Sequence, residues 1–480
     1  MEFEKNALCA LEIAFMQKFR CFCLALNEKN EALIAVCENT LDSHANSNVR
    51  AFSLEKKFAK VAYKNLSDFE VHFTRALKMA RFFELCENLS KKLALLQNNT
   101  SQNATKDSKE VCLLLDFILQ TCIEEKSSDI HFEQNASNAI IRARCDGILH
   151  KVFSLESPLF NALSARLKLE CALDMTQRRK ALDGRFSKKF DEKEYDFRLS
   201  SLPTLQGESL VLRILEQNLQ ITSLESLGFC KNALQLITPS LCKNSGVILL
   251  VGPTGCGKST TLHAMLESLK SESKKIITIE DPIEYQLDFS TQVLLNRDYN
   301  FGFKDALRAC LRQDPDVMMI GEIRDEQTLE LALQAALTGH LVLATLHAND
   351  TRGAMKRILG LGGKMEVLDS ALSLIIAQRL VRKLCTHCKE EVSSTFYESS
   401  VLYAEFVARL GVRKMHRQKG CAYCKNLGFS GRTILYEILP HAPSYEMKGC
   451  ADAVFDKERS MKRLLQEGIS SVEELYRIWG

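Results

Sequence analysis

The sequence contains no apolar run approaching the roughly 20 residues that cross a bilayer as a helix. Residues 1–5, MEFEK, lack the basic segment of a secretory signal peptide, and no signal-type apolar core accompanies them. A large excess of one charge is also missing, since 63 Lys and Arg stand against 60 Asp and Glu. These absences argue against a membrane-spanning or exported protein and against a strong electrostatic footprint for nucleic acid. We therefore expect a cytoplasmic protein.

A chain of 480 residues is too long for one hydrophobic core, and its length predicts about two to four domains. Its 46% apolar and 26% charged residues are typical of a globular protein. The 18 cysteines are scattered and show no compact disulfide framework. Without an export signal, we interpret them as reduced thiols, apart from any that hold a metal ion.

The most informative stretch is GPTGCGKST, residues 252–260, which fits the phosphate-loop pattern G-x-x-x-x-G-K-[ST]. A short apolar run that predicts a buried strand precedes it, and a helical pattern follows. In this context the glycines let backbone N–H groups point at an anion, and the helix N-terminus adds partial positive charge. We expect a nucleoside triphosphate here, with Lys258 on the β- and γ-phosphates and Ser259 on Mg²⁺. The expected binding residues are Gly252, Pro253, Thr254, Gly255, Cys256, Gly257, Lys258, Ser259 and Thr260.

The order of strands and helices over residues 111–215 differs from the order after residue 246. Residues 111–215 mix two helical patterns with strand signals and the turn Asp146-Gly147, which predicts an α+β domain. From residue 246, strands and helices alternate, which predicts a mostly parallel α/β sheet with its ligands at the C-terminal strand ends. The candidate strands of that sheet are 247–251, 276–280, 317–321 and 341–346.

The remaining boundaries follow from composition. A polar stretch free of large apolar residues predicts a flexible linker after residue 97, and an isolated apolar run at 32–36 predicts a strand before it. The predicted organisation is 1–97, a small N-terminal adaptor domain; 98–109, the linker; 110–218, the α+β domain; 219–384, the phosphate-loop core; 385–440, a tetracysteine module; and 441–480, a C-terminal helical region.

Four further stretches resemble the Asp box, the atypical Walker B motif, the His box and the helix that follows it in the secretion ATPase superfamily. Within that superfamily the chain is most similar, over residues 111–440, to the GspE/PilB branch of hexameric motors for type II secretion pseudopili and type IV pili. The resemblance implies a RecA-like phosphate-loop motor core, preceded by a PAS-like α+β domain and followed by a Cys₄ subdomain and a helical tail. The four stretches are 277–285, 311–325, 338–350 and 377–385.

The resemblance gives three residues beyond the loop a role in hydrolysis. Glu322 follows the apolar strand and is the expected catalytic base for the attacking water, with organisation of Mg²⁺ as its alternative. Glu280 is expected to orient the water or Mg²⁺, unless it or Glu284 merely caps a helix. His347 is expected to sense the γ-phosphate, although a lone histidine is more often structural, as we expect for His340.

The family also supplies arginines from the α+β domain to the active site of a neighbouring subunit. The pattern over residues 198–213 points to Arg198 and Arg213, with Arg185 as a further candidate. Surface arginines are otherwise usually solvated or paired with acidic residues.

Two C-x-x-C pairs supply four thiolates, the donor set of a tetrahedral structural zinc site. A reactive or redox pair is the alternative. The expected zinc ligands are Cys385, Cys388, Cys421 and Cys424.

Taken with the resemblance, these features predict an ATPase that works as a homohexameric ring and powers a type II secretion or type IV pilus-like machine. We expect the N-terminal domain to dock on the cytoplasmic domain of an inner-membrane partner, a GspF/PilC-like platform protein to be driven by the ring, and the motor to lie peripherally at the inner membrane. No direct nucleic-acid contact is expected. The alternatives are a nucleic-acid-binding phosphate-loop ATPase and a platform subunit that binds ATP without hydrolysing it.

Overall fold

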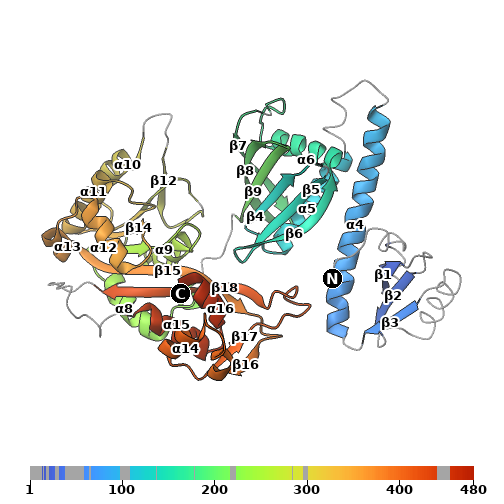
Figure 1. Ribbon diagram of the computed structural model, residues 1–480. Helices are drawn as coiled ribbons and strands as arrows, with labels where there is room; N and C mark the ends of the chain where they lie inside the picture. Colours follow the sequence, from blue (N-terminus) through green and yellow to red (C-terminus); the bar gives the residue numbers. More distant parts are fainter. Residues whose placement is uncertain are drawn as a thin grey trace. The chain divides into compact units, whose positions relative to one another are not determined.

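The computed structural model forms two compact units, Met1–Glu216 and Gln217–Gly480, each considered by itself (Figure 1). The predicted linker lies outside the described residues except for Lys109, and so does Glu284. The division into six segments stays a prediction. The structure describes residues 13, 16–17, 21–26, 32–37, 59–63, 66–97, 109–136, 138–177, 179–216, 223–283, 285–295, 301–440 and 455–479.

The first unit begins with a three-stranded sheet of order β1-β2-β3. Strand β2, Ala32–Cys37, confirms the strand predicted at 32–36; it pairs antiparallel with β1, Cys21–Leu26, and parallel with β3, Ala59–Tyr63. Sequence reasoning missed β1 and β3. The 32-residue helix α4, Leu66–Gln97, follows the sheet.

The rest of this unit is the predicted α+β fold, a six-stranded antiparallel sheet of order β6-β5-β4-β9-β8-β7. Helices α5 and α6 and the last turns of α4 share one apolar core with the sheet, because alternate strand residues such as Phe132, Phe197 and Leu212 are buried against them. The elements are α5 Lys109–Glu124, β4 Asp129–Gln134, β5 Asn138–Cys145, β6 Ile148–Glu156, α6 Ser157–Glu170, β7 Leu182–Phe190, β8 Lys193–Thr204 and β9 Gly207–Glu216.

A charged pair is buried inside this core. The Lys168 side chain on α6 is 1% exposed and forms an ion pair with Glu208 on β9. Ser164 donates its hydroxyl to the other Glu208 oxygen at 2.8 Å. Because both carboxylate oxygens have partners, the pair is tolerated in a region that would otherwise exclude charge.

The second unit is a three-layer α/β fold around a seven-stranded sheet of order β12-β11-β13-β14-β10-β15-β18. Helices α7, α8 and α9 pack on one face, and α10 to α13 pack on the other. All neighbouring strands run parallel except the last pair, β15 and β18. The strands are β10 Gly246–Val251, β11 Ile276–Glu280, β12 Thr291–Leu294, β13 Val317–Ile320, β14 Leu341–Leu346, β15 Leu372–Leu384 and β18 Phe429–Pro440. The helices are α7 Leu224–Leu227, α8 Lys231–Leu241, α9 Lys258–Leu269, α10 Phe303–Leu311, α11 Glu326–Leu337, α12 Thr351–Gly360 and α13 Met365–Ala371.

The four strands predicted for the parallel sheet are confirmed, but the helix expected at 377–385 is wrong. Residues 377–384 belong to the 13-residue strand β15, which pairs parallel with β10 and antiparallel with β18, and Cys385 follows its end. The helix was expected from the resemblance, and the Leu, Ala, Gln, Arg and Lys residues of this segment, which all favour helices, do not argue against it. Burial of residues 372–378 between two partner strands overrides that propensity.

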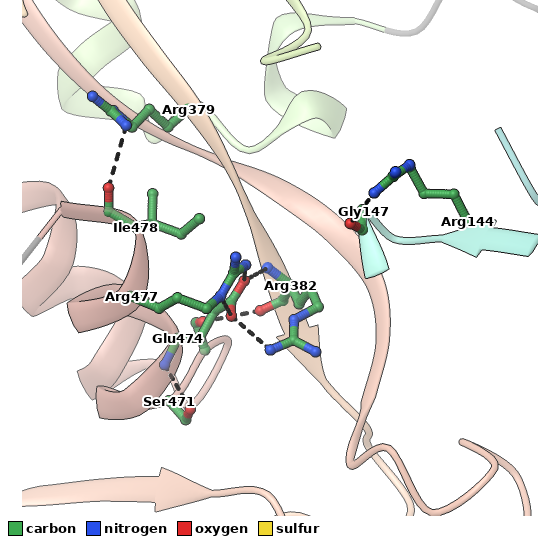
Figure 2. Close-up of polar contacts among 9 residues, drawn as sticks. Arg144, Gly147, Arg379, Arg382, Ser471, Glu474, Arg477 and Ile478 are labelled. Carbon is green, nitrogen blue, oxygen red and sulfur yellow. Dashed lines mark hydrogen bonds and ion pairs between the residues drawn. The ribbon is translucent and has the colours of Figure 1, made fainter. Parts of the chain in front are cut away.

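The C-terminal part of this unit packs on the outer strands of the sheet. Its core joins Val381 of β15 and Leu435 of β18 to apolar residues of the two last helices. Glu474 of the last helix is 1% exposed and holds it to β15 (Figure 2): one oxygen accepts from Arg382 Nη2 at 2.8 Å, and Arg477 Nη2 donates to the other at 2.8 Å. The elements are β16 Glu390–Ser393, the 3-10 helix Ser394–Tyr397, α14 Ala404–Leu410, β17 Lys414–Arg417, α15 Lys457–Gln466 and α16 Val472–Trp479.

Among the helices in the described part of the chain, none combines the length and the apolar character needed to cross a bilayer.

Breaking the buried pair is expected to destabilise the α+β domain strongly. Glu208→Gln leaves the Lys168 ammonium buried without its counter-charge, which costs about 3–5 kcal/mol of unfolding free energy. Urea unfolding of the full chain measures the loss as a lower midpoint of the transition that reports this domain.

Two variants complete this test. Lys193→Ala breaks an ion pair whose lysine side chain is 61% exposed, so its cost should stay below about 1 kcal/mol. Lys168→Met combined with Glu208→Leu should recover much of the lost stability. A Glu208→Gln midpoint equal to that of Lys193→Ala would contradict the account.

Candidate functional site

The phosphate loop lies between the fully buried strand β10 and helix α9. Gly252, Gly255 and Gly257 all have positive φ, at 154°, 75° and 87°. A Cβ on Gly252 would lie 2.5 Å from the carbonyl oxygen of Gln378, so only glycine fits there. Lys258 Nζ donates to the Gly252 and Pro253 carbonyls at 2.9 and 3.1 Å, which holds the ammonium inside the curl of the loop.

Gln378 is a residue of this site that sequence reasoning did not single out. It lies on β15, is 1% exposed, and donates from Nε2 to the Cys256 carbonyl at 2.9 Å. Its Oε1 accepts from the Thr261 hydroxyl at 3.0 Å. The side chain therefore ties the loop to the first turn of α9. Only the pairing of β10 with β15 brings Gln378 there, so no local sequence signal could have found it.

Glu322 and His347, predicted to act separately as base and sensor at the γ-phosphate, are neighbours in the structure. Glu322 follows β13 and its side chain is 20% exposed; His347 follows the adjacent strand β14. The His347 Nε2 atom lies 3.1 Å from Glu322 Oε1, and Arg324 Nε donates to Glu322 Oε2 at 2.6 Å. A pocket of about 100 Å³ is lined by Ser259, Glu280 and Glu322, among others. The loop and the acidic strand ends thus border one cavity.

Glu280 is the last residue of β11 and is 6% exposed. Its Oε1 accepts from the Thr278 hydroxyl at 2.8 Å and from Gln292 Nε2 at 3.1 Å, while His263 Nε2 lies 3.6 Å from Oε2. Burial alone would raise the pKa of Glu280, but His263 and these two donors outweigh it and lower the pKa. These partners are side chains, so Glu280 is not a helix cap but a carboxylate kept charged beside the pocket.

Other acidic and histidine residues of the motifs are structural. Asp325 caps α11 by accepting from Thr328 N at 2.8 Å, and Asp350 caps α12 in the same way. Asp316 accepts from Lys275 N at 2.6 Å. His340 Nδ1 lies 2.8 Å from the Ala335 carbonyl, near the C-terminal end of α11.

The candidate arginines lie side by side in the first unit. Arg185, Arg198 and Arg213 are direct cross-strand neighbours on β7, β8 and β9. The next neighbour in this row is Asp129 of β4, whose Oδ1 accepts from Arg213 Nε at 3.1 Å. Arg144 of β5 completes the row, with Nε 3.7 Å from Asp129 Oδ2. Like charges facing each other across strands repel, so this face of the sheet favours an anion.

The four predicted metal ligands come together in the second unit. The sulfur of Cys385 lies 3.9 Å from that of Cys421, and Cys388 lies 3.8 Å from Cys424. All four sulfur atoms are within 4.8 Å of one another. Four thiolates at about 2.3 Å from a tetrahedral ion would be about 3.8 Å apart, so the cluster matches such an ion. Backbone N–H groups of Cys421 and Gly428 donate to the Cys424 sulfur, at 3.2 and 3.1 Å.

Comparison with known proteins agrees with this geometry. Residues 104–476 match the family described as type II/IV secretion system protein. In Pseudomonas aeruginosa, a protein named type II secretion system protein E is 38% identical over 388 residues, covering 78% of this chain and 76% of that protein. The type IV pilus assembly ATPase PilB of the same organism is 38% identical over 391 residues, covering 78% and 69%.

A solved structure shows the same fold. The Legionella pneumophila ATPase DotB matches with a TM-score of 0.55 at 21% identity, over 76% of this chain and 95% of its own. This likeness bears on the fold alone, and it confirms the predicted class of a RecA-like core with an α+β domain before it. With the family match over most of its length, the chain belongs to the type II/IV secretion system protein family.

Proposed function

We propose that this chain is a Mg²⁺-dependent ATPase motor, working as a homohexamer, that powers assembly of a type II secretion pseudopilus or a type IV pilus-like machine. The observation that carries the proposal is the contact between Glu322 and His347 at the edge of a pocket that also includes Ser259 of the phosphate loop. A sensor of the phosphate and a base for the water must both face the γ-phosphate, and adjacent parallel strands deliver both.

Hydrolysis then uses side chains of the phosphate loop and of the neighbouring strand ends. Lys258 leaves its carbonyl partners for the β- and γ-phosphates of bound ATP. Mg²⁺, held with the Ser259 hydroxyl, would neutralise charge that builds up on the phosphates. Glu322 accepts a proton from the attacking water, and Glu280, whose lowered pKa keeps it ionised, orients that water or the ion. His347 exchanges its contact with Glu322 for one with the γ-phosphate and so reports the nucleotide state.

The arginine row supports a ring. Arg185, Arg198 and Arg213 lie side by side on neighbouring strands, and of these Arg213 pairs with Asp129, so the row has positive charge to offer an anion from outside its own domain. A ring of six lets each α+β domain present Arg198 and Arg213 to the nucleotide of the next subunit. Asp129 holds the Arg213 side chain by accepting a hydrogen bond from its Nε atom at 3.1 Å.

The motor's partners follow from the same proposal. The N-terminal domain docks on the cytoplasmic domain of an inner-membrane protein, and movement of the α+β domain against the core drives a GspF/PilC-like platform protein. The chain then acts from the cytoplasmic side, bound peripherally to the inner membrane. The two Pseudomonas relatives, one of each system, are equally identical to this chain, which fits a motor common to both kinds of machine.

Replacing the proposed base tests the catalytic assignment. Glu322→Gln keeps the shape of the side chain but cannot take a proton, so we expect steady-state ATPase activity to fall by roughly 100-fold or more. Binding of a fluorescent ATP analogue should change little, because the loop is untouched.

The matched control is Asp325→Asn, three residues away, because asparagine also caps a helix. Its ATPase rate should stay within a factor of about two of the parent rate. If Glu322→Gln hydrolyses ATP at the parent rate, Glu322 is not the base, and a subunit that binds ATP without hydrolysing it becomes the better account.

We also propose that Cys385, Cys388, Cys421 and Cys424 hold a structural zinc ion. All four positions around the ion are taken by thiolates, so the metal stabilises the module and leaves no site for a catalytic water. Cys388→Ser should therefore release one zinc per chain, measured by elemental analysis. The module should lose protection from hydrogen exchange, while nucleotide binding at the distant phosphate loop persists. Retention of the parent's zinc by Cys388→Ser would contradict this assignment.

A further inference from the structure

A second cluster of metal-ligand side chains lies in the first unit. Among the described residues, Glu125, Cys145 and His150 have ligand atoms that all lie within 4.8 Å of one another. Glu125 comes directly after α5, Cys145 ends β5, and His150 lies on β6, beyond the hairpin turn. Three separate segments thus bring a carboxylate, a thiol and an imidazole close together.

Two of the three distances between these groups are close to those of a tetrahedral zinc site. His150 Nε2 lies 3.3 Å from Glu125 Oε2 and 3.9 Å from Cys145 Sγ. Around a tetrahedral zinc ion with ordinary bond lengths, a nitrogen and an oxygen are about 3.3 Å apart, and a nitrogen and a sulfur about 3.6 Å. The distance from His150 Nε2 to Cys145 Sγ is a few tenths of an ångström longer than in such a site, and the ligand atoms of Glu125 and Cys145 lie within 4.8 Å of each other.

The surroundings suit a bound thiolate. The Ser127 hydroxyl lies 3.2 Å from Cys145 Sγ and can donate to it. The thiol now points toward the Glu125 carbonyl oxygen, 3.4 Å away. The side chains of His150 and Glu125 are 21% and 19% exposed, so they are shielded from solvent but not sealed from it.

We propose that Glu125, Cys145 and His150 bind a divalent transition-metal ion, with zinc as the ion that this thiolate, imidazole and carboxylate set favours. One thiolate and one carboxylate balance the two positive charges. Binding at neutral pH releases two protons to solvent, one from the Cys145 thiol and one from the His150 imidazole, because hydrogen bonds with Cys145 and Glu125 raise the pKa of His150 to about 9. The fourth position is open to water. This site is separate from the Cys₄ cluster, which lies in the other unit.

The ion would join the end of α5 to the β5–β6 hairpin. Arg144, a member of the arginine row, directly precedes Cys145 and donates from Nη1 to the Gly147 carbonyl in the hairpin turn at 3.1 Å (Figure 2). A metal on Cys145 and His150 therefore fixes the strand and the turn that carry Arg144. Occupancy of the site would stiffen the end of the row that carries Arg144.

Metal content of the full-length protein tests the proposal. The protein is saturated with zinc, freed of excess by gel filtration, and analysed for zinc per chain. Cys145→Ser and His150→Ala should each lower the content by one ion relative to the parent, and Cys388→Ser should remove a different one, so that Cys145→Ser with Cys388→Ser loses two. Cys112→Ser, a half-buried cysteine on α5 outside the cluster, is the matched control and should lose none.

Glu125→Gln covers the case in which a cysteine or histidine variant fails to fold. It keeps the size of the side chain and removes one ligand charge, so zinc should dissociate from this site at least about tenfold more readily in competition with a chelating dye. Zinc content and dye competition unchanged in Cys145→Ser and Glu125→Gln would overturn the proposal and leave the three groups as a hydrogen-bonded network. Neither measurement depends on ATP hydrolysis, so failure here is distinct from failure of the proposed motor function.

Discussion

Parallel pairing of β11, β13, β14 and β10 is the constraint on which the site depends. Parallel strands end at the same edge of a sheet, and here Glu280, Glu322 and His347 lie at or just past three of those ends, with the phosphate loop leaving the fourth. The same order lets Glu322 and His347 come into contact although 25 residues separate them in the printed sequence. Shifting one strand by a residue would turn these side chains to the other face.

Buried polar side chains hold this edge in shape. Gln378 satisfies the loop carbonyl of Cys256 and the Thr261 hydroxyl together, and Glu280 is held by Thr278 and Gln292. A polar side chain that is buried without a hydrogen-bond partner destabilises the fold. Once its partners are in place, it favours a single arrangement of the side chains around it. Glu474 does the same for the C-terminal helix, by accepting from Arg382 and Arg477. The nucleotide edge and the C-terminal module are therefore both anchored to β15, through Gln378 and Arg382.

Local sequence signals predicted the parts of the fold that chemistry or turn geometry fixes within a few residues. The phosphate loop needs its glycines, the C-x-x-C pairs need their spacing, and Asp146-Gly147 marks a hairpin whose two turn residues both have positive φ. The parallel strands were found because each is a short apolar run between helical patterns.

Local sequence signals failed where pairing with a strand far away in the sequence determines the structure. Residues 377–384 favour a helix locally and become strand because β10 and β18 flank them. The role of Gln378, and the alignment of Arg185, Arg198 and Arg213 with Asp129, follow from strand register, which no single stretch encodes. The cluster of Glu125, Cys145 and His150 was missed for the same reason, since its members come from three elements.

The central claim is that each active site borrows an arginine from the next subunit. The most direct test is steady-state ATPase activity against protein concentration for the parent and for Arg213→Ala, with the oligomer size recorded at each point. The account predicts that specific activity rises as rings form and that Arg213→Ala assembles equally well but turns over at least about 100-fold more slowly. Activity that is flat with concentration and indifferent to Arg213 would contradict it.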